Sequence, residues 1–169
     1  MFRVLLASAA LVVGVMSCDS AIQLIEQAEG FRACEYVDTT GHPTICYGFN
    51  LVASGAQAAV EAVGGDYEKV LHGGCLSQQQ CEELLSKSAN AAISSANRIF
   101  GDLCPCVNAV LADMTYNLGS AGISSFTTFK SYIEAHEWSK ASDDLKGTLW
   151  CRQVGSRCTR DAGIIAQGC

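Results

Sequence analysis

Ten cysteines in 169 residues constrain this chain more than any other feature of its sequence. An even number of cysteines at this density is typical of a secreted domain held together by disulfides, so we expect five bonds. A zinc site would require Cys-x2-Cys pairs or clustered histidines, and neither is present. We therefore predict neither a metal site nor a cofactor. The cysteines are Cys18, Cys34, Cys46, Cys75, Cys81, Cys104, Cys106, Cys151, Cys158 and Cys169.

The first residues have the pattern of a secretory signal peptide, predicted over residues 1–17. A short basic start at residues 1–3 is followed by an uncharged apolar run over residues 4–16, which is too short to span a membrane. An N-terminal anchor and a lipid-modified Cys18 are the alternatives, although the even cysteine count suggests that Cys18 has a disulfide partner. We expect one domain over residues 18–169, secreted outside the cell or into a digestive vacuole or lumen.

The charge of the chain limits its partners. A net charge of −6 disfavours nucleic acid as a partner, and it also disfavours a cationic, membrane-disrupting role. Acidity does not exclude a sugar polymer, because glycan recognition depends on hydrogen bonds and stacking more than on charge. We therefore expect no nucleic-acid partner and no membrane partner.

The N-terminal third predicts a helix followed by a hairpin. An apolar stripe over residues 20–28 indicates a helix that Ser20 can cap and that Gly30 ends. Two β-rich runs, residues 34–38 and 44–47, flank a Thr-Thr-Gly turn and predict a β-hairpin.

The pattern of the rest of the chain predicts helices. Ser77 and Gln80 form a capping box, which opens a helix that can run to Phe100 and connect two lobes. The fold class is therefore α+β and mostly helical, with a small hairpin lobe, a long connecting helix and a helical C-terminal lobe. Further helices are predicted over residues 56–63, 107–118, 125–135, 137–149 and 160–169.

Three polar residues near the hairpin are candidates for catalysis: Glu29, Asp38 and Thr44. Two carboxylates across a cleft are what cleavage of a glycosidic bond requires. One donates a proton to the leaving oxygen, and the other, kept ionised, supports a water molecule. Taken alone, these residues also fit an ordinary helix-end glutamate and a turn aspartate.

A wider set of motifs resembles the phage-type lysozymes of glycoside hydrolase family 24, here in a secreted, disulfide-rich version. The resemblance covers nearly the whole mature chain, including the long helix that opens at Leu76-Ser77. Its first block consists of Glu29-Gly30, Tyr36-Val37-Asp38, Gly41 and Thr44-Ile45-Cys46-Tyr47-Gly48. Its second block consists of Tyr116-Asn117-Leu118-Gly119, Phe126, Trp138, Trp150, Gln153, Arg157 and Arg160.

The resemblance implies a muramidase, which hydrolyses the β-1,4 bond between N-acetylmuramic acid and N-acetylglucosamine in peptidoglycan. It makes Glu29 the general acid, Asp38 the second carboxylate and Thr44 the residue that helps to place the attacking water. The family inverts the configuration at the cleaved carbon, and carboxyl groups about 6.5–9.5 Å apart would agree with inversion. A monomer is the family's usual state.

The resemblance also implies substrate-binding residues. Tyr116 and Asn117 occupy positions that line the saccharide groove of the family, although ordinary helix packing would explain them equally well. Asn50 is assigned to the groove as well, and Phe129 is assigned to it by spacing alone. Arg157 corresponds to an arginine that contacts the catalytic glutamate, so its two-pronged guanidinium is expected to orient Glu29. A solvated loop arginine is the alternative.

Three departures from the family pattern fall beside the first block, one of which is Asn50-Leu51 where the family has two apolar residues. Cys46 replaces a glycine of the Thr-Ile-Gly segment, which fits a disulfide, and Phe49 replaces the usual histidine. These changes bear on stability and pH response more than on the type of reaction. His42, at the hairpin tip, is interpreted as a surface histidine, with a substrate contact as the alternative.

The positions of the cysteines suggest how they pair. We expect Cys34–Cys46 across the hairpin, Cys75–Cys81 at the start of the long helix and Cys151–Cys158 around the Arg157 loop. Ring closure between Cys104 and Cys106 would be strained. These two cysteines should therefore bind the termini, through Cys18 and Cys169, in an order that the sequence leaves open.

Two other functions remain compatible with the sequence. One is a glycoside hydrolase that cuts a chitin-like polymer, and the other is a non-catalytic glycan-binding module. Five disulfides suggest surroundings rich in proteases or acid, so we expect a digestive or antibacterial role.

Overall fold

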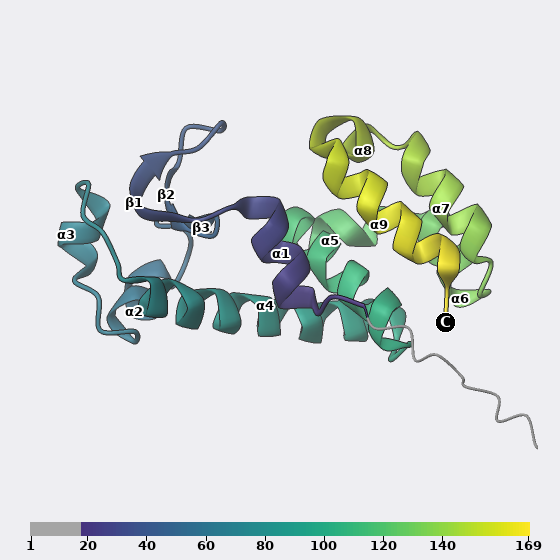
Figure 1. Ribbon diagram of the computed structural model, residues 1–169, viewed down its shortest axis with the longest axis horizontal. Coiled ribbons are helices and arrows are strands. Elements are labelled where there is room, and N and C mark those ends of the chain that lie inside the picture. Colours follow the sequence, from purple (N-terminus) through teal and green to yellow (C-terminus); the bar gives the residue numbers. More distant parts are fainter. Residues whose placement is uncertain (1–17) are drawn as a thin grey trace, which may run out of the picture.

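The computed structural model describes residues 18–169, and the predicted signal peptide lies outside these residues. The described part is mostly helical, with one small antiparallel sheet, so the predicted fold class is confirmed (Figure 1). The strands are β1 (Arg32–Val37), β2 (Pro43–Cys46) and β3 (Phe49–Asn50). The helices are α1 (Ala21–Glu29), α2 (Ala56–Glu61), α3 (Tyr67–Leu71), α4 (Gln78–Phe100), α5 (Pro105–Ser124), α6 (Thr127–Glu134), α7 (Trp138–Gly147), α8 (Leu149–Val154) and α9 (Ser156–Gln167).

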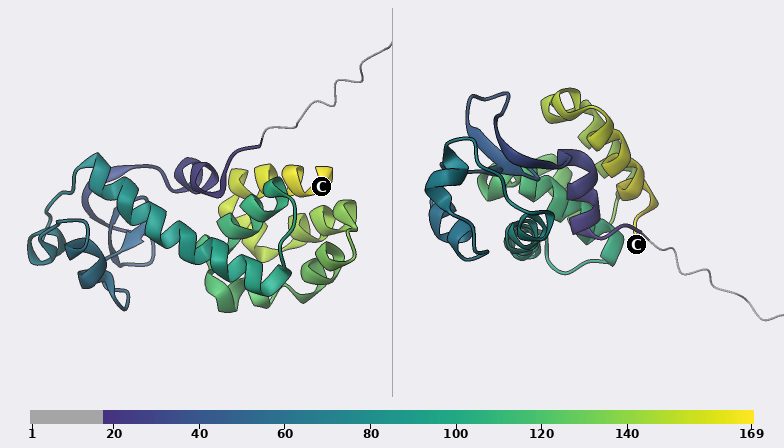
Figure 2. Two further views of the ribbon diagram at one scale, coloured as in Figure 1. Left: turned by 90° about the horizontal axis from the view of Figure 1, so that it is seen from below. Right: turned by 60° about the vertical axis from the view of Figure 1, so that its left-hand side comes forward.

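Two lobes are joined by the long helix α4, as predicted. The sheet, α2 and α3 form the smaller lobe, and α5 to α9 form the larger one (Figure 2). Each lobe has its own apolar core, represented by Ile45 and Val60 in the first and by Met114 and Ile133 in the second. Helix α1 packs against both α4 and α5 between the lobes. None of the described helices is long and apolar enough to cross a membrane.

Capping residues place the two helices that matter most for the site. Ser20 and Gln23 form a capping box at the start of α1, and Ser77 and Gln80 form the one predicted at the start of α4. Gly30 ends α1 with a φ of +70°, a conformation that suits glycine. The chain therefore turns sharply after Glu29 and enters the sheet.

The sheet contains the predicted hairpin and one further strand. β1 and β2 pair with Tyr36 opposite Thr44, but the register shifts at a bulge, so that Arg32 lies opposite Cys46. The two-residue strand β3 then pairs with β2, with Asn50 opposite Thr44. This strand was not predicted, because two residues carry no alternating pattern.

Several helix boundaries differ from the prediction. Helix α5 continues past Leu118 to Ser124, with a kink at Gly119. The short helices α3 and α8 were not predicted, and α9 begins at Ser156 instead of Arg160. Helices α3 and α8 are too short to show a helical period, whereas α2, equally short, lies in an alanine-rich stretch that predicted it.

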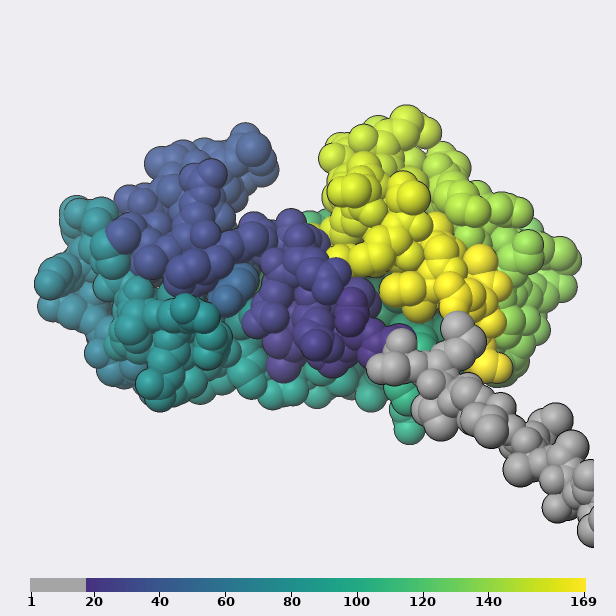
Figure 3. Space-filling model, viewed as in Figure 1, coloured from purple at the N-terminus to yellow at the C-terminus, as the bar shows by residue number. Residues whose placement is uncertain are grey.

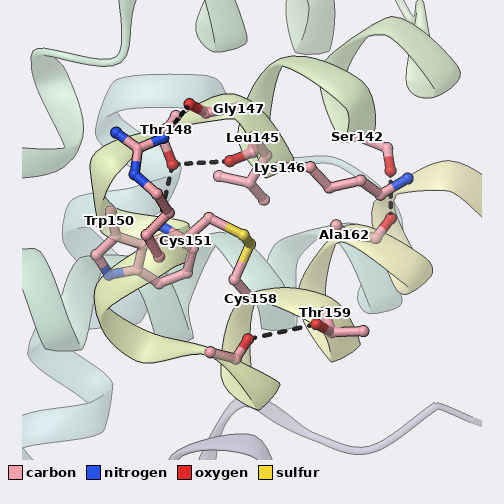
Figure 4. The surroundings of a disulfide bond; sticks show 12 residues. Ser142, Leu145, Lys146, Gly147, Thr148, Trp150, Cys151, Cys158, Thr159 and Ala162 are labelled. Carbon is pink, nitrogen blue, oxygen red and sulfur yellow. Dashed lines mark hydrogen bonds between the residues drawn. A yellow bond between two sulfur atoms is a disulfide. The ribbon is translucent and has the colours of Figure 1, made fainter.

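All ten cysteines are paired, and part of the predicted pairing is confirmed. Cys151 bonds to Cys158, which lies on the neighbouring helix α9 (Figure 4). Cys104 and Cys106 bind the two ends of the described chain, as expected. The bonds are Cys18–Cys106, Cys34–Cys75, Cys46–Cys81, Cys104–Cys169 and Cys151–Cys158.

The predicted Cys34–Cys46 and Cys75–Cys81 bonds are wrong. The bulge in β1 puts Arg32 opposite Cys46, and Cys34 instead forms a bridge with Cys75, to which it is bonded. Cys46 is buried and bonds to Cys81 in the first turn of α4. Both disulfides therefore fasten the hairpin to the start of the connecting helix.

The disulfides are expected to differ in their contribution to stability. The Cys18–Cys106 bond closes 88 residues and the Cys151–Cys158 bond closes 7. Chain entropy then predicts losses of about 5 and about 2 kcal/mol when each pair is replaced by alanine. Denaturant unfolding of the two double variants measures this difference, and equal losses would contradict the entropic account.

Candidate active site

The surface is hollowed between the hairpin and the C-terminal helices (Figure 3), and Glu29, at the end of α1, lines a pocket. This pocket has a volume of about 500 Å³ and is lined by residues that include Asn117, Ser156 and Arg157. A second pocket of about 340 Å³ is lined by Gly48, Asn50, Tyr116 and their neighbours. Glu29 lines the first pocket, and its carboxyl lies against Gly48, which lines the second, so Glu29 lies between the two pockets.

The two oxygens of Glu29 have different surroundings. Oε1 accepts a hydrogen bond of 2.7 Å from Nη1 of Arg157. Oε2 lies so close to Gly48 that a Cβ atom there would be 2.8 Å from it, and Gly48 also has a φ of +74°. The side chain of Glu29 is only 21% exposed. The arginine therefore fixes the carboxyl through Oε1 and leaves Oε2 for a ligand.

Arg157 contacts Glu29 as expected, but its two-pronged interaction is with another acid. Nε and Nη2 donate to Oδ2 and Oδ1 of Asp113 over 2.9 and 2.8 Å, and Nη2 also donates to the Asp113 carbonyl. Both side chains are buried. Asp113 thus fixes the arginine that holds Glu29. The sequence interpretation missed it, although an acid within the apolar run of α5 was a signal.

A second arginine and a third acid extend this cluster. Arg160 donates to Oδ2 of Asp113 over 2.8 Å, to Oδ1 of Asp161 over 3.0 Å and to the carbonyl of Leu24 in α1 over 2.9 Å. Burial and then the negative charge of Asp113 raise the pKa of Asp161 to about 7, against the lowering effect of Arg160. Oδ2 of Asp161 has no hydrogen-bond partner within residues 18–169.

The raised pKa of Asp161 predicts how stability depends on pH. An unfolded aspartate has a pKa of about 3.9, so the folded protein holds this proton more tightly. The resulting stability is fully present below about pH 4 and is lost as the pH rises through 7. The loss is on the order of 2–4 kcal/mol. The denaturant concentration at the unfolding midpoint of Asp161→Asn should therefore stay nearly constant between pH 4.5 and 7.5, whereas that of the wild type should fall. If the midpoints of the two proteins change with pH in parallel, this assignment is wrong.

Asp38 lies at the hairpin tip as an ionised carboxylate. Its Oδ1 accepts hydrogen bonds from the backbone N–H of Thr40 over 2.8 Å and of His42 over 2.9 Å, and from the Thr40 hydroxyl over 2.8 Å. The bond from the His42 backbone, followed by that from the Thr40 hydroxyl, holds the pKa of Asp38 below its ordinary value. This charge state is the one expected of a second carboxylate.

Thr44 has an oriented hydroxyl. Its side chain is buried in β2, and Oγ1 donates to the carbonyl of His42 over 3.1 Å. Since a hydroxyl has one proton, the remaining lone pairs of Oγ1 are acceptors. Thr44 can therefore accept a hydrogen bond from a water molecule near Asp38.

The predicted groove residues differ in how much of each side chain is available. The Tyr116 hydroxyl donates to the carbonyl of Tyr47 over 2.9 Å, and burial raises the pKa of Tyr116 to about 12. The Oδ1 atom of Asn117 accepts from the indole of Trp150 over 2.8 Å, which leaves Nδ2 as its donor for a ligand. Both residues line the pockets beside Glu29.

Asn50 and Phe129 complete the predicted set. Asn50 lines the second pocket, and its Oδ1 accepts from the backbone N–H of Val52 over 2.9 Å. Phe129 is wrong as a substrate-binding residue, because its side chain is fully buried and packs edge-on against Phe100 at 6.2 Å between ring centroids. Spacing along α6 did not reveal that this position faces the core.

Comparisons with known proteins identify the family of this chain. The model of the family described as phage lysozyme matches residues 26–165, which contain every site residue from Glu29 to Arg160. Probable T4-type lysozyme 2 of Dictyostelium discoideum is 24% identical over 157 residues, which cover 86% of this chain and 92% of that protein. Pre-baseplate central spike protein Gp5 of Enterobacteria phage T4 is 24% identical over 170 residues, which cover 88% of this chain and 28% of the phage protein.

Proposed function

The chain belongs to the phage lysozyme family of glycoside hydrolases, and on this premise we propose that it is a muramidase. Its substrate is bacterial peptidoglycan, in which it hydrolyses the β-1,4 bond between N-acetylmuramic acid and N-acetylglucosamine. The observation that carries the proposal is the carboxyl of Glu29 between two pockets, with one oxygen held by Arg157 and the other against Gly48.

Glu29 is the general acid of the proposed reaction. Its Oε2 donates a proton to the glycosidic oxygen as the bond breaks. Arg157 holds Oε1 of this carboxyl, and Asp113 in turn takes two hydrogen bonds from the same guanidinium.

Asp38 and Thr44 place the attacking water. Asp38 is ionised and can accept a proton from water, while Thr44 presents acceptor lone pairs because its own proton is bonded to the His42 carbonyl. A water positioned by both groups would attack the sugar from the face opposite Glu29, which inverts the configuration. A general acid or base of this kind accelerates reactions by about 10²–10⁴-fold.

Groups on both sides of Glu29 bind the sugar chain. Asn117 offers its Nδ2 donor in the first pocket, and Tyr116 and Asn50 offer an aromatic ring and an amide in the second. Aromatic rings and amides suit N-acetyl sugars, since they provide stacking and hydrogen bonds. Arg157 contributes by orienting Glu29.

The disulfides suggest where the enzyme works. Five bonds are typical of proteins secreted into oxidising surroundings, such as the cell exterior or a digestive lumen. In such a place the enzyme would act as a monomer on bacteria, in digestion or defence. Resistance to pepsin-like proteases at acid pH would support the digestive version.

The proposed substrate is tested by assaying purified peptidoglycan and chitin side by side. We expect the turbidity of peptidoglycan to fall while chitin releases no soluble sugar. Release from chitin alone would assign the enzyme to chitin-like polymers. Binding to peptidoglycan without turnover would instead indicate a glycan-binding module.

A further inference from the structure

The hairpin tip contains a chain of polar contacts that the proposed reaction does not yet use. The Thr40 hydroxyl lies 2.8 Å from Oδ1 and 3.0 Å from Oδ2 of Asp38. The same hydroxyl lies 2.8 Å from Nδ1 of His42, a side chain that is half exposed. Thr40 therefore joins an imidazole to the second carboxylate of the groove.

Counting protons fixes the direction of these contacts. An ionised carboxylate only accepts hydrogen bonds, so Asp38 must receive the single proton of the Thr40 hydroxyl. The hydroxyl oxygen can then only accept from His42. Nδ1 of His42 must therefore carry a proton, either in the neutral ring or in the imidazolium ion.

We propose that His42 is a positioning residue for Asp38, acting through the Thr40 hydroxyl, an inference that rests on the proposed function. The chain of donors runs from Nδ1 of His42 to Thr40 and from Thr40 to Asp38. Oδ1 of Asp38 then has three donors: the backbone N–H groups of Thr40 and His42 and the Thr40 hydroxyl. The contact of this hydroxyl with Oδ2 is longer. Oδ2 is thus the oxygen that takes the proton of the attacking water.

The turn itself does not need the imidazole. The backbone N–H of His42 donates to Oδ1 of Asp38, and the backbone N–H of Asp38 donates to the carbonyl of His42 over 2.9 Å. The hydroxyl of Thr44 donates to that same carbonyl. Because these bonds use backbone atoms of His42, its side chain can be changed while the hairpin keeps its form.

The charges around the tip favour the same arrangement. Nδ1 of His42 lies 4.0 Å from Oδ1 of Asp38, so a protonated ring adds an attraction to the hydrogen bonds. Further along β1, the Arg32 guanidinium lies 4.4 Å from the centroid of the Tyr36 ring. Burial first, and the charges of Glu29 and Asp38 with it, raise the pKa of Tyr36 against the lowering effect of Arg32.

The test compares His42→Leu, which removes the donor, with His42→Asn, whose amide N–H can occupy the position of Nδ1. We expect His42→Leu to lower kcat on peptidoglycan about 5–10-fold, with KM changed less than about twofold. The acid limb of its pH profile should move to higher pH, and His42→Asn should recover most of kcat. His72→Leu, outside the groove on the smaller lobe, is the matched control.

Two outcomes would overturn the inference. One is a kcat of His42→Leu equal to that of the wild type, while Asp38→Asn is inactive. The other is a ¹⁵N NMR spectrum of the folded wild type showing neutral His42 with its proton on Nε2. The spectrum decides the direction of the chain even if the wild type does not hydrolyse peptidoglycan, an outcome that would refute the proposed function separately.

Discussion

Glu29→Gln is expected to lower the rate of peptidoglycan hydrolysis by about 10³-fold. Glutamine has nearly the same size and still offers an oxygen to Arg157, so the groove should keep its shape. Its amide has no acidic proton, and the glycosidic oxygen would leave without protonation. Clearing of a peptidoglycan suspension, followed at equal protein concentration, measures the effect.

A matched control separates the loss of the acid from the loss of a negative charge on α1. Glu26 lies one turn earlier on the same helix and forms no part of the groove-lining set around Glu29. Glu26→Gln should clear peptidoglycan as the wild type does. If Glu29→Gln clears it equally fast, Glu29 is not the acid.

Arg157→Met is expected to destabilise the protein by about 3–5 kcal/mol. The change would leave Asp113 buried without its two-pronged partner and would release Oε1 of Glu29. Activity should fall as well, because Glu29 is no longer oriented. Arg157→Lys should restore little of either property, since an ammonium group does not reproduce the planar fork. Denaturant unfolding at pH 7 measures the stability.

Arg152 on α8 provides the control for that experiment. It is exposed, and its guanidinium donates to the carbonyl of Gly147. Arg152→Met should therefore change the free energy of unfolding by less than about 0.5 kcal/mol. An Arg157→Met protein as stable as Arg152→Met would show that the buried cluster does not hold the lobe together.

Features that depend on neighbouring residues were predictable from the sequence. The caps Ser20 and Ser77 each lie three residues before a glutamine, and both helices begin where this pattern places them. The hairpin was predicted from two β-rich runs around a turn. The resemblance to phage-type lysozymes added Arg157, which lies 128 residues after Glu29 and contacts it.

Features that depend on distant packing were not predictable in the same way. The bulge in β1 shifts Cys46 away from Cys34, and nothing within the hairpin sequence indicates the bulge. An acid in the apolar run of α5 stands out in the sequence, but its partners Arg157 and Arg160 are seen only in the structure. Phe129 faces the core because α6 turns that side inward, which its spacing from other groove positions does not reveal.

Analysis of the digestion products tests the central claim most directly. Purified peptidoglycan is treated with the wild type and with Glu29→Gln, and the soluble fragments are identified by mass spectrometry. The wild type is predicted to release disaccharide-peptides with N-acetylmuramic acid at the reducing end, and Glu29→Gln to release almost none. Fragments ending in reducing N-acetylglucosamine, or no soluble fragments from the wild type, would contradict the account.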